Sequence, residues 1–158
     1  MAESVVPVPV DEALDLLDVL IAYDTVALTP NLDLISDVQD RLEALGASVV
    51  LTHDDSGTKA NLFATIGPNI NGGVVLSGHS DVVPVDPADW TTPPFTADRR
   101  HGRVYGRGTA DMKGFVACVL AMAPIYAELD LTVPIHVALT FDEEDGFHGA
   151  PILLADLV

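Results

Sequence analysis

The 158-residue chain is poor in cysteine and in basic residues. It contains a single cysteine, Cys118, which excludes an intramolecular disulfide framework and fits a reducing compartment. Only 7 lysines and arginines stand against 24 aspartates and glutamates, so the formal net charge is −17. Binding to nucleic-acid phosphates or to anionic membranes needs an excess of basic residues, which this composition does not supply. We therefore expect neither nucleic acid nor a membrane as a partner.

Long hydrophobic runs and targeting signals are also missing. The longest apolar stretch, residues 114–127, is too short to span a bilayer and contains Pro124. The first residues show no positively charged segment followed by an apolar one, so we expect no signal peptide. Because 49% of the residues are hydrophobic, a packed core is available and disorder is a poor alternative. These features predict a soluble, cytoplasmic chain long enough for one compact α/β domain.

The spacing of apolar residues predicts interleaved helices and strands. A helix is expected from Asp11, with that residue as its cap, and a second one over 31–45, ended by Gly46 in a left-handed conformation. Residues 74–77 predict a short strand that is buried on both faces, whereas the proline-rich stretch 83–103 predicts a long ordered loop. The remaining expected elements are strands over 47–52, 61–66 and 133–141 and helices over 112–129 and 149–157. This alternation predicts an α/β sandwich around a mixed sheet.

Polar residues follow three of these apolar elements. The first group is His79 and Asp81, directly after the strand over 74–77. Side chains two residues apart in an extended segment share a face, so the pair can point the same way. Neutral imidazole is a good metal ligand, and a nearby carboxylate can hold its tautomer and raise its basicity. The alternative is a surface turn that contains a histidine and an aspartate by chance.

The second group is a glycine-rich turn, residues 106–114, which leads into an apolar helix. A nucleotide-binding loop is disfavoured, because the third glycine of the dinucleotide fingerprint and a GK[ST] triplet are both missing. The turn is better suited to hold Asp111 at a helix start, with its carboxylate aimed into a cleft. The alternative for Asp111 is an ordinary helix cap.

The third group consists of four consecutive acids, residues 142–145, after the strand over 133–141. Their mutual repulsion is relieved either in a solvated loop or by divalent cations. With cations bound, one of Glu143 and Glu144 could bind metal while the other takes a proton from water. Sites in open α/β sheets collect beyond the carboxyl ends of strands, and all three polar groups are expected there. Together they predict a metal site.

The other histidines and the cysteine are expected to have structural roles. His53 and His101 fall in predicted turns and should face solvent. His136 lies within a strand and is interpreted as a packed or edge residue, and His148 as the cap of the next helix. Cys118 lies in the middle of an apolar helix and is expected to be a buried small hydrophobic residue without a catalytic role.

Three stretches, 77–95, 102–115 and 140–150, together resemble the zinc-dependent amidohydrolase family of acetylornithine deacetylase, succinyl-diaminopimelate desuccinylase, aminoacylase and related carboxypeptidases. Within that family, residues 57–68, Thr109 and the acidic pattern after 140 are most similar to acetylornithine deacetylase. The Pro-Pro-Phe sequence at 93–95 also suits the desuccinylase.

The resemblance implies a three-layer α/β sandwich with a mixed sheet and a site for two divalent metal ions, zinc or cobalt. It makes His79 a ligand of one metal, Asp111 the bridging carboxylate and Glu144 a ligand of the second metal. Glu143 matches the general base and Asp81 the carboxylate that supports the histidine. The family often has a cis peptide after the bridging aspartate, here Asp111–Met112.

The implied reaction is hydrolysis of the amide bond of a small N-acyl amino acid, with N-acetylornithine giving ornithine and acetate in arginine biosynthesis. The alternatives are succinyl-diaminopimelate, another N-acyl amino acid or a dipeptide as substrate, and a non-catalytic metal- or partner-binding module. Residues 1–158 would form the amino-terminal part of the catalytic domain, because family members are more than twice this length.

The family's lid domain, through which members form homodimers, has no counterpart in the 158 residues. Neither does an acidic ligand about one helix beyond Glu144, nor a histidine ligand near the C-terminus. Each metal would then keep only two protein ligands, whereas a catalytic zinc ordinarily has about three. We therefore expect the 158-residue chain alone to bind metal weakly and to have little or no activity.

Overall fold

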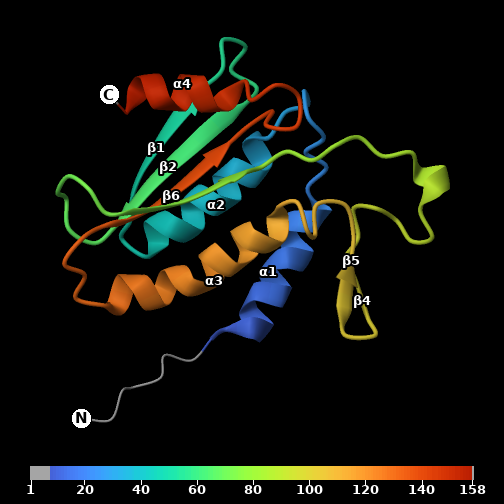
Figure 1. Ribbon diagram of the computed structural model, residues 1–158, viewed down its shortest axis with the longest axis horizontal. Helices are drawn as coiled ribbons and strands as arrows, with labels where there is room; N and C mark the ends of the chain where they lie inside the picture. The colour runs from blue at the N-terminus through green and yellow to red at the C-terminus, as the bar shows by residue number, and fades with distance from the viewer. Residues whose placement is uncertain (1–7, 158) are drawn as a thin grey trace.

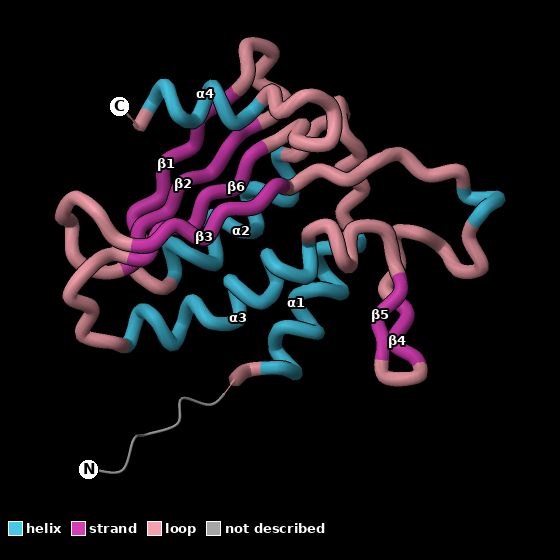
Figure 2. Tube along the Cα trace, viewed as in Figure 1, coloured by secondary structure: helices cyan, strands magenta, loops and turns pink. Residues whose placement is uncertain are grey.

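A four-stranded mixed β-sheet forms the centre of the molecule, a computed structural model that describes residues 8–157 (Figures 1 and 2). The strand order is β1-β2-β6-β3. The pairs β1–β2 and β2–β6 are antiparallel, and β3 and β6 run parallel. The strands are β1 Ser48–His53, β2 Ala60–Ile66, β3 Val74–His79 and β6 Ile135–Thr140. The mixed sheet predicted from the sequence is confirmed.

Helices cover both faces of this sheet and so complete three layers (Figure 1). On one face α2 and α3 contact the strands, and α1 packs beside α3. On the other face lies α4, which accepts hydrogen bonds from Thr52 of β1, through Asp156, and from Asn61 of β2, through a backbone carbonyl. The helices are α1 Val10–Ala22, α2 Leu32–Ala44, α3 Lys113–Glu128 and α4 Gly149–Asp156. The three-layer α/β sandwich is therefore the observed fold.

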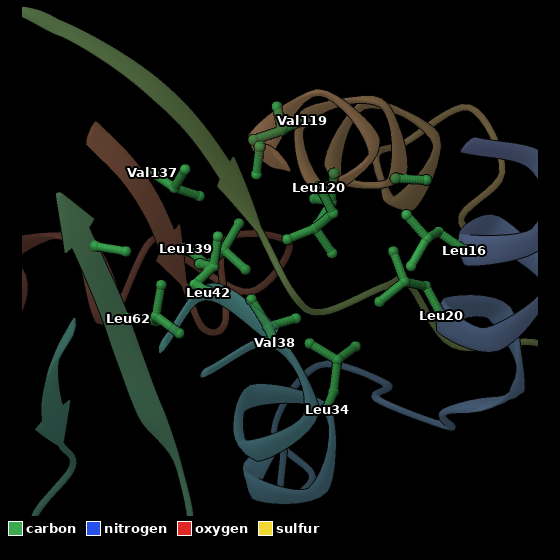
Figure 3. Close-up of a cluster of buried hydrophobic side chains, with 14 of the residues drawn as sticks. Leu16, Leu20, Leu34, Val38, Leu42, Leu62, Val119, Leu120, Val137 and Leu139 are labelled. Atoms are coloured by element: carbon green, nitrogen blue, oxygen red, sulfur yellow. The ribbon is translucent and has the colours of Figure 1, made fainter. Parts of the chain in front are cut away.

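The hydrophobic core lies between the sheet and helices α1 to α3. Alternate residues of β2 and β6 point into it, as a period of two requires of strands with one face on a core. Figure 3 shows these side chains meeting leucines and valines of the three helices. Fully buried members include Leu20, Leu34, Val38, Leu42, Leu62, Val137 and Leu139. Burial of each such side chain stabilises the folded state by about 1.5–3 kcal/mol. This packing fixes the positions of the strand ends.

The helix ends follow local rules, with one correction. Gly46 has a φ of +81° just after α2, as predicted for a left-handed helix stop. The prediction that Asp11 caps the first helix is wrong, because α1 begins at Val10 with Pro9 in the capping position. Asp11 instead lies in the first turn, where a carboxylate is favourable beside the positive end of the helix dipole.

The prediction that the strand over 74–77 is buried on both faces is wrong. Val74 and Val75 are 54% and 52% exposed, and only Gly78 and His79 of β3 are buried. Within the described residues β3 is an edge strand, paired with β6 alone. A short apolar run shows that a strand is favourable but does not reveal what covers it.

The stretch 83–103 is more ordered than the predicted loop. It contains a short 3-10 helix, Pro87–Asp89, and the first strand of a hairpin formed by β4 Asp98–Arg100 and β5 Arg103–Tyr105. Figure 1 shows the hairpin projecting away from the sheet. Its two turn residues, His101 and Gly102, both have positive φ, which suits a two-residue hairpin turn. Strands of three residues are too short to show a periodicity in the sequence.

The prediction that Cys118 is buried is also wrong, because its side chain is exposed on α3. That helix is apolar on most of its surface, so the sequence pattern does not mark its inward face. Among residues 8–157 no helix has both the length and the hydropathy needed to cross a membrane. The expectation of no signal peptide concerns, in large part, residues outside the described range.

Candidate metal centre

The candidate site lies where β3 and β6 end side by side. These strands are parallel, with His79 paired to Thr140, so the loops that follow them begin at the same edge of the sheet. The backbone N–H of Ser80 donates to the carbonyl of Thr140 over 2.8 Å and ties the two loops together. This is the position at which open α/β sheets form their sites.

His79 is the last residue of β3 and is only 4% exposed. Its Nδ1 lies 2.9 Å from the backbone carbonyl of Asp81. A carbonyl can only accept, so Nδ1 bears the hydrogen and Nε2 faces the site. There Nε2 lies 3.2 Å from Oδ1 of Asp111 and 3.6 Å from Oε2 of Glu143. The imidazole thus presents one nitrogen to two carboxylates.

Asp81 holds the acidic loop through its buried carboxylate. Its two oxygens accept the backbone N–H groups of Glu143 and Glu144 over 3.1 and 3.0 Å. The carboxylate also lies 3.5 Å from Nδ1 of His79, although the shorter contact of that nitrogen is with the backbone carbonyl of Asp81. Burial by itself raises the pKa of Asp81, but the imidazole and the two N–H groups outweigh this and lower it.

The electrostatics of the site favour a positive charge at its centre. Burial alone lowers the pKa of His79, but the carboxylates of Asp81 and Asp111 act against it and raise the pKa to about 9. Without a cation the imidazole is therefore protonated at neutral pH. A metal ion bound at Nε2 would take the place of that proton.

Asp111 and the two glutamates reach the same place from different segments. Asp111 comes just before α3, and its side chain is 75% exposed. It does not cap α3, because Met112 occupies that position and no side-chain capping bond is present. The Asp111–Met112 peptide is cis, as the resemblance implied. One ligand atom each from His79, Glu143 and Glu144 lie within 4.8 Å of one another.

Glu144 shows the repulsion expected of consecutive acids. Its pKa is raised, first by burial and then by the negative charges of Asp111, Glu143 and Asp81, while His79 acts in the opposite direction. Such a cluster is relieved either by a proton or by a divalent cation. The five residues predicted from the sequence are therefore brought together at one edge of the sheet.

A buried ion pair beside the site was not predicted from the sequence, although one partner, Asp142, belongs to the predicted acidic group. The ammonium of Lys59 forms an ion pair with Asp142, and their side chains are only 11% and 5% exposed. The other oxygen of Asp142 accepts the backbone N–H of Leu28 over 2.8 Å. The sequence carried no signal for this pair, because Lys59 and Asp142 are 83 residues apart.

Lys113 was missed as well. It is 1% exposed, and its ammonium donates to the backbone carbonyl of Tyr23 over 2.7 Å. Burial lowers the pKa of Lys113 to about 8, although Asp24 and Asp81 act in the opposite direction. Lys113 lies at the start of the helix predicted over 112–129, where a lysine is ordinarily exposed. The spacing of apolar residues therefore gave no sign that it is buried.

The remaining histidines lie outside the cluster. His53 and His101 are exposed, as predicted, but only His101 lies in a turn, because His53 is the last residue of β1. His136 stacks on Phe63 within the sheet and is a packed residue, also as predicted. His148 occupies the capping position of α4 but makes no side-chain capping bond.

Residues 75–158 match the sequence model of peptidase family M20/M25/M40. Among curated proteins, the chain is 44% identical over 140 residues to acetylornithine deacetylase of Myxococcus xanthus. This alignment covers 85% of this chain and 36% of that protein. It is 40% identical over 124 residues to acetylornithine deacetylase of Proteus mirabilis, covering 78% of this chain and 32% of that protein. The chain spans about a third of the length of these relatives.

Solved structures agree with the sequence match. Human carnosine dipeptidase 1 superposes with a TM-score of 0.78 at 27% identity, over 92% of this chain and 35% of that one. An M20 family metallo-carboxypeptidase from Sulfolobus solfataricus superposes with a TM-score of 0.72 at 26% identity, over 85% of this chain and 31% of that one. Since the family match covers more than half of the 158 residues, the chain belongs to peptidase family M20/M25/M40.

Proposed function

We propose that the protein to which this chain belongs hydrolyses the amide bond of an N-acyl amino acid with the help of divalent metal ions. N-acetylornithine is the favoured substrate, with ornithine and acetate as products. The observation behind the proposal is the convergence of His79, Asp111, Glu143 and Glu144 at the ends of two parallel strands. The identity of 40–44% to acetylornithine deacetylases supports the choice of substrate.

The side chains at the site fit a divalent cation. One imidazole nitrogen and several carboxylates form the donor set, which suits zinc and cobalt. The half-buried carboxylate of Glu144 has a raised pKa beside other acids, so a positive charge there is favourable. By the family resemblance, His79 and Asp111 would hold one ion, and Asp111 and Glu144 the other.

The divalent ions and the side chains of the protein supply different parts of the chemistry. When bound, divalent ions supply a Lewis acid for the scissile carbonyl and lower the pKa of water. Glu143, whose Oε2 lies beside His79, is suited to accept a proton from water and to deliver it to the leaving amine. Asp81 holds both glutamates through their backbone N–H groups. The Asp81 carbonyl fixes the histidine tautomer, so that Nε2 faces the site.

We also propose that residues 1–158 are the amino-terminal part of the catalytic domain, with a lid and dimerisation domain belonging to the whole protein. The threefold greater length of the curated relatives supports this division. The isolated chain is then expected to bind metal weakly and to show little hydrolysis. Succinyl-diaminopimelate and dipeptides remain the competing substrates, and the likeness to a carnosine dipeptidase supports testing a dipeptide.

The experiment compares the whole protein and the 158-residue chain, each with zinc or cobalt, on N-acetyl-L-ornithine, N-succinyl-diaminopimelate and a dipeptide. We expect the whole protein to release acetate fastest, and E143Q to lower kcat by about 100-fold or more, as the loss of a general base does. E128Q, which changes an exposed glutamate at the far end of α3, is the matched control. Faster turnover of either competitor would refute the substrate, and an active E143Q would refute the base.

A further inference from the structure

We propose that the buried Lys59–Asp142 ion pair is a positioning device for the metal centre. It holds the start of the acidic loop, residues 142–145, so that Glu143 and Glu144 face His79 before any cation is bound. The inference rests on the proposed function, because it assigns a purpose to the pair only if that site binds metal. Lys59 is a positioning residue here and not a catalytic one.

Lys59 is presented by a turn that is fixed at several points. The carboxylate of Asp54 accepts the backbone N–H groups of Thr58 and Lys59 over 3.0 and 2.9 Å, and the Asp54 N–H donates to the Lys59 carbonyl over 3.0 Å. The next residue, Ala60, begins β2 and exchanges backbone hydrogen bonds with the side chain of Asn31. The backbone of Lys59 is therefore held on both sides, which limits where its ammonium can lie.

Asp142 uses both carboxylate oxygens to fix the other end of the contact. One oxygen pairs with Lys59 and the other accepts the Leu28 N–H over 2.8 Å. Asp142 also has a φ of +50°, a region that costs energy for residues other than glycine. Such a conformation persists when surrounding contacts impose it, and the ion pair is one of those contacts.

The Lys59–Asp142 pair differs from the other charged contacts of the acidic loop. Within the described residues, Lys59 is the only lysine or arginine in ion-pair contact with any of the four acids at 142–145; the other partners are His79 and His148. Lys113 is buried too, but its ammonium donates to the Tyr23 carbonyl instead. In a low-dielectric environment, one buried cation offsets part of the repulsion among these acids.

The loop backbone is thus held from two sides. Lys59 and Leu28 hold Asp142, while Asp81 binds the N–H groups of the next two residues. These contacts leave the carboxylates of Glu143 and Glu144 free to turn toward His79. Without Lys59, Asp142 would keep a buried charge that has no cationic partner, and the loop would leave this arrangement.

The experiment measures hydrogen exchange in the loop of the metal-free chain and then its affinity for Co²⁺. In K59M we expect the Glu143 and Glu144 amides to exchange about tenfold faster or more through a local opening, while the core amides change only as far as the lower free energy of unfolding requires. Co²⁺ should bind about tenfold more weakly or worse, as is usual when a residue that holds the metal ligands in position is lost. K59R, which keeps the charge, should recover most of both effects, and R41Q, in a half-buried pair with Asp37 on α2, should change neither.

D142N is the second variant, since it removes the charge of the pair but keeps an oxygen for the Leu28 N–H. If K59M does not fold, the same measurements of hydrogen exchange and Co²⁺ affinity on D142N test the positioning role. Wild-type exchange at Glu143 and Glu144 in a folded K59M or D142N would overturn the positioning role, and so would unchanged Co²⁺ affinity. A wild-type chain and whole protein that bind no Co²⁺ or Zn²⁺ would instead refute the proposed function, while the exchange data would still report on the loop.

Discussion

Two ionic contacts join segments about eighty residues apart in this chain, a buried lysine–aspartate pair and an exposed arginine with two aspartates. Lys59 and Asp142, which are 83 residues apart, have side chains that are 11% and 5% exposed. Arg99 of the hairpin donates to Asp15 and Asp18 on α1, where the Asp15 side chain is 72% exposed. Lys59 and Asp142 join segments beside the central strands β2 and β6, whereas Arg99 joins the β4–β5 hairpin to α1.

The difference in burial, and not in charge, decides how much each contact contributes to the stability of the fold. Water screens an exposed pair, and its side chains lose conformational freedom when they pair, so its net contribution is about 0–1 kcal/mol. A buried pair is costly to form, yet removal of one partner leaves an uncompensated charge, which costs about 3–5 kcal/mol. The chain has 24 acids, but few of them hold another segment in place from a buried position.

The largest expected effect is that of K59M. It should lower the free energy of unfolding by about 3–5 kcal/mol, because Asp142 would remain buried without a cation. The double variant K59M/D142L should be more stable than K59M, since neither charge remains. Urea denaturation of the metal-free chain measures both. A K59M cost below about 1 kcal/mol would place this pair in the same class as the exposed one.

The second prediction concerns a buried carboxylate whose shortest contacts are with neutral donors. D81A leaves the N–H groups of Glu143 and Glu144 without their acceptor and should cost about 2–3 kcal/mol. D81N keeps one acceptor oxygen and should cost less. The same denaturation measurement applies. Equal stability of D81A and wild type would mean that water replaces the carboxylate at no cost.

The third prediction tests the exposed pair directly. R99Q should lower the free energy of unfolding by less than about 1 kcal/mol, because its partners are solvated. The difference should shrink further in about 0.5 M salt, which screens exposed charges. Thermal or urea denaturation at two salt concentrations checks both statements. A loss comparable to that of K59M would contradict the importance given to burial.

The smallest expected effect is the pH dependence contributed by Asp54, a carboxylate near the surface with several local hydrogen bonds. Burial alone raises the pKa of Asp54, but the Ser56 hydroxyl and nearby N–H groups outweigh this and lower it below 3.8. A depressed pKa in the folded state adds stability above the unfolded pKa, and this stability is lost as the pH falls through the folded value.

The advantage of wild type over D54N should therefore be constant from about pH 5 to 7 and shrink below about pH 4. Other carboxylates titrate in both proteins and cancel in the difference. Urea denaturation across this range gives the measurement. An advantage that grows on acidification would show that the pKa is raised.

Much of the fold could be predicted because helices and strands leave a local period in the sequence. The helix over 31–45 was predicted to within one residue at each end, and the strand over 61–66 likewise. The errors concern burial. The valines of β3 and the Cys118 side chain were expected inside and lie at the surface. A periodicity marks which residues share a face but not which segment covers it.

The candidate site was predictable for a related reason. His79 and the glutamate pair each follow a strand, and strand ends in α/β folds lie together. Asp111 was also expected after a strand of this sheet, but it lies in the turn just before α3. The role of Lys59 was not predictable, because its partner Asp142 lies 83 residues along the chain. The same holds for Lys113, whose carbonyl acceptor on Tyr23 is 90 residues away.

The sequence by itself determined the order and type of the four helices and the four strands of the main sheet and the set of acids and histidine at the site, since these depend on neighbours a few residues apart. The tertiary structure alone decided which acids are buried and paired. It brought Lys59 to the acidic loop and left Arg99 with its partners at the surface. The physical reason is that solvation and Coulomb energies depend on atoms close in space, however distant they are along the chain.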